Sequence, residues 1–200
     1  MCLPPKLVKS TIDIEVSGAQ VAAQNTRDVS KSPTPNQQIQ TATAITSDAK
    51  AIDFDFVDFT GKPRKLSEFR GKYVLLDFWA TWCRPCLADI PKLKELYEKH
   101  KADGFEIVGM DSEIIGDDDG ESDTEFAKQA VILAKQIVAT RGVTWTQATA
   151  ATTAPIAKKV FKVESLPTKI LLDKEGKIIT TISEKDDLTG IIEKLLQASK

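Results

Sequence analysis

Two cysteines separated by two residues, in the segment Trp82-Cys83-Arg84-Pro85-Cys86, constrain this chain more than any other feature. The segment follows an apolar run, Val74–Ala80, with the pattern of a buried strand, and it opens a helical pattern over residues 83–100. The N-terminus of a helix presents unpaired N–H groups and a partial positive charge, which stabilise a thiolate. Because the thiolate is the nucleophile in disulfide exchange, the motif predicts a redox-active dithiol.

The composition is that of a globular protein, with 42% hydrophobic and 28% charged residues. Basic and acidic residues are mixed along the chain and leave a net charge of −2, so we expect no nucleic-acid partner. No apolar run approaches the roughly 18 residues of a transmembrane helix. Besides the CxxC pair the chain offers only Cys2 and His100, too few for the four ligands, roughly, of a structural zinc site. We therefore expect no metal.

The chain divides near residue 50. Residues 30–38 and the Thr-, Ala- and Gln-rich run after them lack aromatic residues and periodicity, which is typical of a linker or a disordered arm. The alternation in Thr11–Val16 leaves a short edge strand open. A secretory signal needs an apolar core of roughly 7–15 residues, and none is visible. We expect residues 1–50 to form a tail or linker and residues 51–200 to form the folded domain.

Residues 51–200 carry alternating strand and helix patterns. We expect strands over residues 52–59, 73–79, 105–110, 170–172 and 178–181, and helices over residues 83–100, 124–141, 154–161 and 186–198. This order, with a hairpin and a last helix at the end, predicts an α/β fold in which a central mixed β-sheet is covered by helices on both faces. The acidic residues 117–123 are expected to form a solvated loop, because Ile115 stands where a calcium-binding EF-hand needs its first Asp.

These residues resemble the thioredoxin superfamily and, within it, the TlpA/ResA-type thiol–disulfide oxidoreductases. The matching segments are Asp77–Cys86, Asp89-Ile90-Pro91, Leu166-Pro167-Thr168 and Leu172–Lys177. The resemblance covers residues 51–200 and implies a thioredoxin-like fold that needs no bound cofactor. It also implies an extracytoplasmic location, client proteins that contain disulfides or thiols, and an upstream electron donor. Residues 1–50 would be the tether if the domain is anchored to a membrane.

The resemblance implies a role for each matching site residue. Cys83 would be the exposed attacking thiolate, and Cys86 the more buried resolving thiol. Asp77 matches the buried acid that accepts a proton when the mixed disulfide is resolved, and burial of a carboxyl in an apolar strand raises its pKa toward that of a general base. Many TlpA-type members have a neutral residue there, so this chain combines two patterns. The expected client-binding residues are Trp82, Arg84, Pro85, Leu166 and Pro167, the last matching the family's cis-proline.

Two other functions stay open. A peroxide-reducing enzyme on the same fold would need a threonine three residues before its cysteine, whereas Thr81 lies two residues before Cys83. A non-catalytic binding module could use the groove at Pro167 without needing both cysteines. The sequence favours an enzyme that reduces or exchanges disulfides in client proteins. It assigns no role to Cys2 or to the helix over residues 124–141.

Overall fold

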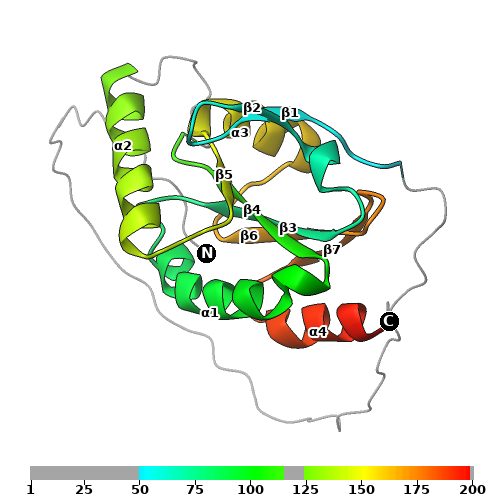
Figure 1. Ribbon diagram of the computed structural model, residues 1–200. Coiled ribbons are helices and arrows are strands. Elements are labelled where there is room, and N and C mark those ends of the chain that lie inside the picture. Colours follow the sequence, from blue (N-terminus) through cyan, green and yellow to red (C-terminus); the bar gives the residue numbers. More distant parts are fainter. Residues whose placement is uncertain (1–49, 115–123, 199–200) are drawn as a thin grey trace, which may run out of the picture. The chain divides into compact units, whose positions relative to one another are not determined.

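The apolar strand before the cysteines is the centre of a five-stranded sheet (Figure 1). The computed structural model describes residues 50–114 and 124–198. The strands of the sheet, in spatial order, are β5 (Thr146–Ala148), β4 (Phe105–Asp111), β3 (Tyr73–Trp79), β6 (Thr168–Leu172) and β7 (Ile178–Ile182). β3, β4 and β5 run parallel, and β6 and β7 pair antiparallel to their neighbours. The expected mixed sheet of an α/β fold is confirmed.

Helices cover both faces of the sheet, because successive side chains of β3 point to opposite sides. On one face, Leu75 packs with residues of α1 (Arg84–His100) and α4 (Leu188–Ala198). On the other face, Leu76 and Phe78 pack with α3 (Ala150–Ile156). The second layer on that face also contains β1 (Asp55–Val57), β2 (Pro63–Lys65) and the short helix η1 (Leu66–Phe69).

The structure corrects several expected element boundaries. The strand expected over residues 52–59 is limited to β1, and the turn after it leads into β2, with which β1 pairs antiparallel. β5 was not expected, since its three residues are too few to show a period. The helix expected over residues 154–161 begins at Ala150 and continues as the π-helical segment η3 (Ala157–Phe161). Pro155 lies inside α3, where it supplies no N–H to the helix.

The expected long helix is present as α2 (Thr124–Thr140). It packs through Ala134, Ile137 and Val138 against the cluster that contains the cysteines. Leu133 is 46% exposed and Ile132 is 50% exposed, because a helix at the edge of a sheet buries only a narrow stripe. In the part of the chain that the structure describes, no helix is long and apolar enough to cross a membrane.

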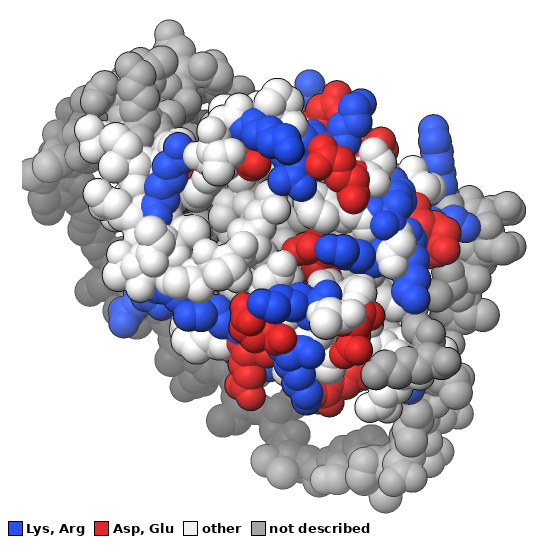
Figure 2. Space-filling model, viewed as in Figure 1, with Lys and Arg blue, Asp and Glu red and all other residues white. Residues whose placement is uncertain are grey.

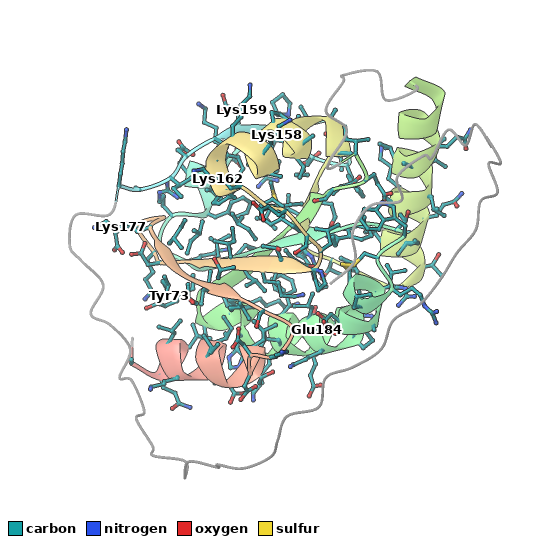
Figure 3. All side chains as sticks on the ribbon, turned by 180° about the vertical axis from the view of Figure 1, so that it is seen from behind. Tyr73, Lys158, Lys159, Lys162, Lys177 and Glu184 are labelled. Atoms are coloured by element: carbon teal, nitrogen blue, oxygen red, sulfur yellow. A yellow bond between two sulfur atoms is a disulfide. The ribbon has the colours of Figure 1, made fainter. Side chains whose placement is uncertain are left out.

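The expectations for residues 1–49, including Cys2, and for the acidic loop over residues 117–123 lie outside the described residues. On the face seen in Figure 2, basic and acidic side chains of the described residues are interspersed. The reverse view in Figure 3 labels Lys158, Lys159 and Lys162 on and after η3. Lys162 ends that segment in the left-handed conformation, with φ of 51°.

Gly109 leaves room for a side chain that supports Trp79. It lies in β4 and pairs with Asp77 of β3. A Cβ at this position would overlap Oε1 of Gln147, and this oxygen accepts a 2.9 Å hydrogen bond from Nε1 of Trp79. The absence of a side chain at Gly109 therefore permits the buried contact that fixes the indole ring at the end of β3.

We predict that Gly109→Ala lowers the free energy of unfolding by about 1–3 kcal/mol, the usual cost of overpacking a core. Urea unfolding followed by far-UV circular dichroism measures this change. Gly190→Ala in α4 is the control, because its Cβ would meet only the side chain of Asp187, which is exposed and free to move. The control is expected to change the free energy of unfolding by less than about 1 kcal/mol. Equal stability of both variants would contradict this account.

Candidate active site

Cys83 and Cys86 occupy the first turn of α1, where β3 ends and the chain reverses. Cys83 is the N-cap residue, with φ of −84° and ψ of 92°, and its Sγ accepts a 3.3 Å hydrogen bond from the N–H of Cys86. Pro85 lies in the same turn, where its missing N–H costs no helical hydrogen bond. The two cysteines form a disulfide with their Cα atoms 5.3 Å apart. The structure thus represents the oxidised state of the pair.

Both cysteines are buried in this state. Cys83 is 0% exposed and Cys86 is 3% exposed, so the expectation that Cys83 is the exposed thiol is wrong for the disulfide-bonded form. The reason is local: the Sγ of Cys83 faces back into the first turn of α1, and Trp82 packs against the same core cluster. Arg84, between the two cysteines, is exposed. Its guanidinium is therefore screened by water, which weakens the stabilisation that its positive charge gives to a thiolate at Cys83.

Asp77 is brought to the same place from the middle of β3. It is 5% exposed and lines a small cavity together with Cys86 and Trp79. The free volume of this cavity is about 10 Å³, close to the room that one water molecule needs. Oδ1 of Asp77 has no hydrogen-bond partner among the described residues. The carboxyl group of Asp77 and the side chain of Cys86 therefore line one cavity.

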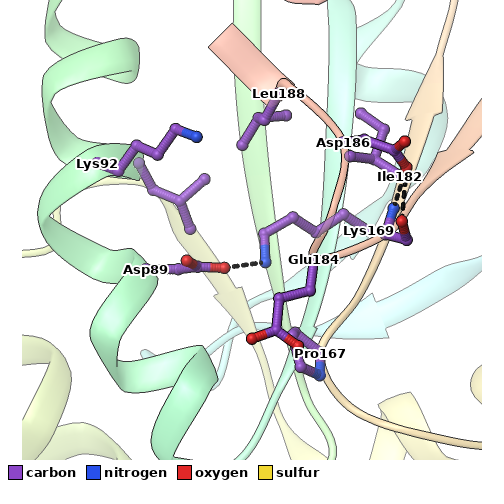
Figure 4. Close-up of a pocket in the computed structure, with 10 residues that line it drawn as sticks. Asp89, Lys92, Pro167, Lys169, Ile182, Glu184, Asp186 and Leu188 are labelled. Carbon is purple, nitrogen blue, oxygen red and sulfur yellow. Dashed lines mark hydrogen bonds and ion pairs between the residues drawn. The ribbon is translucent and has the colours of Figure 1, made fainter. Parts of the chain in front are cut away.

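A buried lysine, which the sequence analysis did not single out, lies beside Asp77. Lys169 of β6 is directly opposite Asp77 in the antiparallel register, and its Nζ is 3.4 Å from Oδ1 of Asp77. The same Nζ donates a 2.7 Å hydrogen bond to Oδ2 of Asp89 on α1 (Figure 4). Lys169 is 5% exposed, and its ammonium lies between the carboxylates of Asp77 and Asp89.

The charges of these three groups oppose the effects of burial. Burial raises the pKa of the Asp77 carboxyl, and the Lys169 ammonium offsets this only in part. Burial lowers the pKa of Lys169, but the charges of Asp77 and Asp89 outweigh it, so the pKa of Lys169 is raised. Lys169 therefore stays charged while Asp77 holds its proton to higher pH than an ordinary carboxyl. A carboxylate whose pKa is raised is a stronger base than an ordinary one.

The bond between Leu166 and Pro167 is cis, which agrees with the expected match to a cis-proline. Thr168 pairs with Phe78, so Pro167 lies at the end of the sheet where β3 leads into the cysteine loop. The side chain of Leu166 is 0% exposed, which leaves any contact with a client to its backbone. Of the other expected client-binding residues, Trp82 and Pro85 are half-buried.

A pocket lies on the α1 and α4 side of Pro167, and Figure 4 shows its walls. Its lining residues are Asp89, Lys92, Leu93, Pro167, Lys169, Ile182, Ser183, Glu184, Asp186 and Leu188. Acidic and basic groups are both present, and the pocket reaches the ion pair of Lys169 and Asp89. In the described part of the chain, no group of three or more His, Cys, Asp or Glu residues is arranged to hold a metal ion.

A sequence signal for Lys169 existed. Asp77 is the only charged residue of β3, and Lys169 is the only charged residue of β6. A single opposite charge in each of two apolar strands indicates that they are paired, because a buried charge needs a partner. The sequence does not give the register of the two strands, so it does not show that Lys169 lies opposite Asp77.

Comparison with known proteins places this geometry in a family. A sequence model of the Redoxin family matches residues 40–196. The thiol-disulfide oxidoreductase ResA of a Bacillus cereus strain is 33% identical over 149 residues, which span 73% of this chain and 76% of that protein. ResA of Bacillus subtilis (strain 168) is 29% identical, over 70% of this chain and 69% of that protein.

Solved structures agree with the fold. The thioredoxin domain of a thiol-disulfide oxidoreductase from Bacteroides vulgatus has a TM-score of 0.58 and 26% identity, covering 77% of this chain and 99% of that one. A thiol:disulfide interchange protein from Bacteroides sp. has a TM-score of 0.58 and 28% identity, covering 76% of this chain and 91% of that one. With its cysteine pair at the start of a helix and these relatives, this chain belongs to the Redoxin family and is a thiol–disulfide oxidoreductase with a thioredoxin-like fold.

Proposed function

We propose that this oxidoreductase reduces disulfides in client proteins, with Cys83 as the attacking thiolate, Cys86 as the resolving thiol and Asp77 as the proton acceptor. One observation carries the proposal: Cys83 and Cys86 form a disulfide in the first turn of α1, and the buried Asp77 lines the same cavity as Cys86. A nucleophile, a second thiol and a base are thus within one small volume.

In the first step, the reduced Cys83 thiolate attacks one sulfur of a client disulfide. The client S–S bond breaks, a bond forms between Cys83 and the client, and the other client sulfur leaves as a thiolate that takes a proton from water. The N-terminus of α1 favours the Cys83 thiolate, because Sγ accepts the N–H of Cys86.

In the second step, Cys86 resolves the mixed disulfide. Asp77 accepts the proton of the Cys86 thiol, across the cavity that has room for about one water molecule. The Cys86 thiolate attacks Sγ of Cys83, the disulfide between the two cysteines forms, and the second client sulfur leaves as a thiolate. Two electrons pass from the dithiol to the client, and the Lys169 ammonium stabilises ionised Asp77 before it takes the proton.

The direction of electron flow follows from how weakly the site stabilises a thiolate. A strong oxidant such as DsbA owes its potential to a reduced form that is strongly stabilised. Here the favourable groups are one helix N-terminus and the exposed Arg84, whose charge water screens. These groups support a reductase rather than an oxidase.

We place the client segment along the backbone at Leu166 and Pro167, next to Trp82. This placement is supported by the position of the cis-proline at the end of β6 that adjoins the cysteine loop. The mixed charges of the pocket beside Pro167 would contact client side chains that extend toward α1.

The resemblance to TlpA/ResA-type proteins supports an extracytoplasmic location and a role in cell redox homeostasis. In this proposal residues 1–50 form a linker or tether and residues 51–200 form the redox domain. The oxidised dithiol must be reduced again after each turnover, so a dithiol-bearing electron donor is the second partner.

We predict that Cys86→Ser accumulates a mixed disulfide with a client, whereas Cys83→Ser does not. Cys86→Ser keeps the attacking thiol of Cys83, but the mixed disulfide that it forms cannot be resolved. Cys83→Ser has no attacking thiol. Incubation of each reduced variant with oxidised insulin, followed by non-reducing electrophoresis and mass spectrometry, measures the adduct. If the mixed disulfide accumulates only in Cys83→Ser, then Cys86 is the attacking thiol and Cys83 the resolving thiol.

We predict that Asp77→Asn slows the resolving step about a hundredfold, the lower end of what a general base contributes. Ionised Asp77 accepts the proton and protonated Asp77 does not, so the wild-type rate rises with pH through the pKa of Asp77. Burial raises that pKa, and Lys169→Met, which removes the offsetting ammonium, should move the rise to higher pH. Quenched alkylation after rapid mixing measures the rate at each pH.

The control for this test is Asp58→Asn. Asp58 is also buried, at 7% exposure, but its carboxylate holds the turn between β1 and β2. Asp58→Asn is expected to leave the pH profile of the resolving step unchanged. If Asp77→Asn behaves like this control, Asp77 is not the proton acceptor.

A further inference from the structure

Glu113 and Asp111 form a second buried carboxyl pair, on the β4 side of the cysteine loop. Asp111, the last residue of β4, pairs with Trp79 in the parallel register, and the next residue, Ser112, donates its N–H to the Trp79 carbonyl at 2.8 Å. The chain after β4 therefore runs alongside the end of β3. Glu113 then lies beside the cysteine loop, and its Oε1 accepts the N–H of Thr81.

The two carboxyl groups interact with each other and are both withdrawn from water. Asp111 is 0% exposed and Glu113 is 5% exposed, and the N–H of Glu113 donates to Oδ1 of Asp111 at 3.2 Å. Burial, together with the charge of Glu113, raises the pKa of Asp111 to about 8. Burial also raises the pKa of Glu113, and the hydrogen bond from Thr81, which favours the ionised form, offsets this only in part. Because the charge of Glu113 is one cause of the raised pKa of Asp111, Glu113 is the group of the pair that ionises first.

That charge has no cation beside it. Among the described residues, no Lys, Arg or His lies within ion-pair distance of Glu113 or Asp111, whereas Asp77 on the neighbouring strand has Lys169. Oδ2 of Asp111 also has no hydrogen-bond partner in the described part of the chain. A buried charge without a counter-ion is costly, so its position next to the redox loop calls for a physical reason.

We propose that Glu113 is a positioning residue for the dithiol. Its carboxylate accepts a hydrogen bond from the Thr81 N–H and so fixes the loop that carries Cys83, and its charge, which has no counter-ion among the described residues, makes the Cys83–Cys86 dithiol a stronger reductant. The inference rests on the proposed function, because it concerns the same dithiol. Thr81 is two residues from Cys83, and Cα atoms are about 3.8 Å apart along the chain, which places the carboxylate within roughly 10 Å of Cys83. At that distance a buried charge is little screened by salt.

The direction of the effect follows from charge repulsion. The negative carboxylate disfavours the Cys83 thiolate, which exists only in the reduced form, and leaves the neutral disulfide unaffected. The reduced form then gives up its two electrons more readily to a client disulfide. Glu113 thereby opposes the N-terminus of α1, which stabilises the same thiolate through the N–H of Cys86.

The test separates the charge from the hydrogen bond. Glu113→Gln keeps an oxygen that accepts the Thr81 N–H but removes the charge. We expect the equilibrium constant for oxidation of the dithiol to fall about tenfold, which is a rise of about 30 mV in midpoint potential, and the pKa of Cys83 to fall. Redox titration of the full chain in glutathione buffers and the pH dependence of alkylation measure the two quantities.

Glu113→Asp is the complementary variant, since it keeps the charge but is too short by one methylene for the Thr81 N–H. We expect its midpoint potential to stay near the wild-type value while its exchange rate with client disulfides falls. Glu106→Gln is the matched control, because Glu106 is a buried glutamate of β4, the strand that leads to Glu113, but it pairs with Lys72 at 2.8 Å. Its potential is expected to equal that of the wild type.

Equal potentials for Glu113→Gln and Glu106→Gln would overturn the inference and leave the proposed function standing. A potential that shifts as much in Glu113→Asp as in Glu113→Gln would also overturn it, because the charge would then not be the cause. A wild-type chain with no reversible disulfide would overturn both the inference and the proposed function.

Discussion

The N-terminus of α1 is the constraint on which the site depends. Its first N–H groups have no helical partners, and the Sγ of Cys83 accepts one of them, from Cys86, at 3.3 Å. This contact caps α1, and the disulfide joins both sulfur atoms in its first turn. The sheet on either side of β3 then determines what surrounds the sulfur atoms: β6 brings Lys169 and Pro167, and the segment after β4 brings Glu113.

Buried charge is handled differently on the two sides of the dithiol. Asp77 lines a cavity and shares the ammonium of Lys169 with Asp89, which supports its proposed role as the proton acceptor. Glu113 has the Thr81 N–H and a protonated neighbour, Asp111, but no cation among the described residues. The first arrangement suits proton transfer in the resolving step. The second suits a fixed negative charge that biases the redox equilibrium. Both depend on low exposure, because water would weaken either effect.

The sequence predicted those parts of the fold that have long or regular patterns. The apolar run of β3, the helical period of α1 and the hairpin of β6 and β7 were predicted, and the CxxC motif identified the dithiol. β5 was missed because three residues show no period. The pairing of Lys169 with Asp77 requires the strand register, and the contact of Glu113 with Thr81 requires the path of the chain beyond β4. Cys83 is buried in the disulfide-bonded form, and the sequence does not specify which redox state the structure has.

The midpoint reduction potential of the Cys83–Cys86 pair tests the central claim most directly. The full chain would be equilibrated in defined thiol buffers, and the reduced fraction would be read by mass-shift alkylation. A reductase is predicted to have a potential near that of thioredoxin, about −270 mV. A value near that of DsbA, about −120 mV, would contradict the proposed direction of electron flow, and the absence of a reversible bond would contradict the assignment of the dithiol itself.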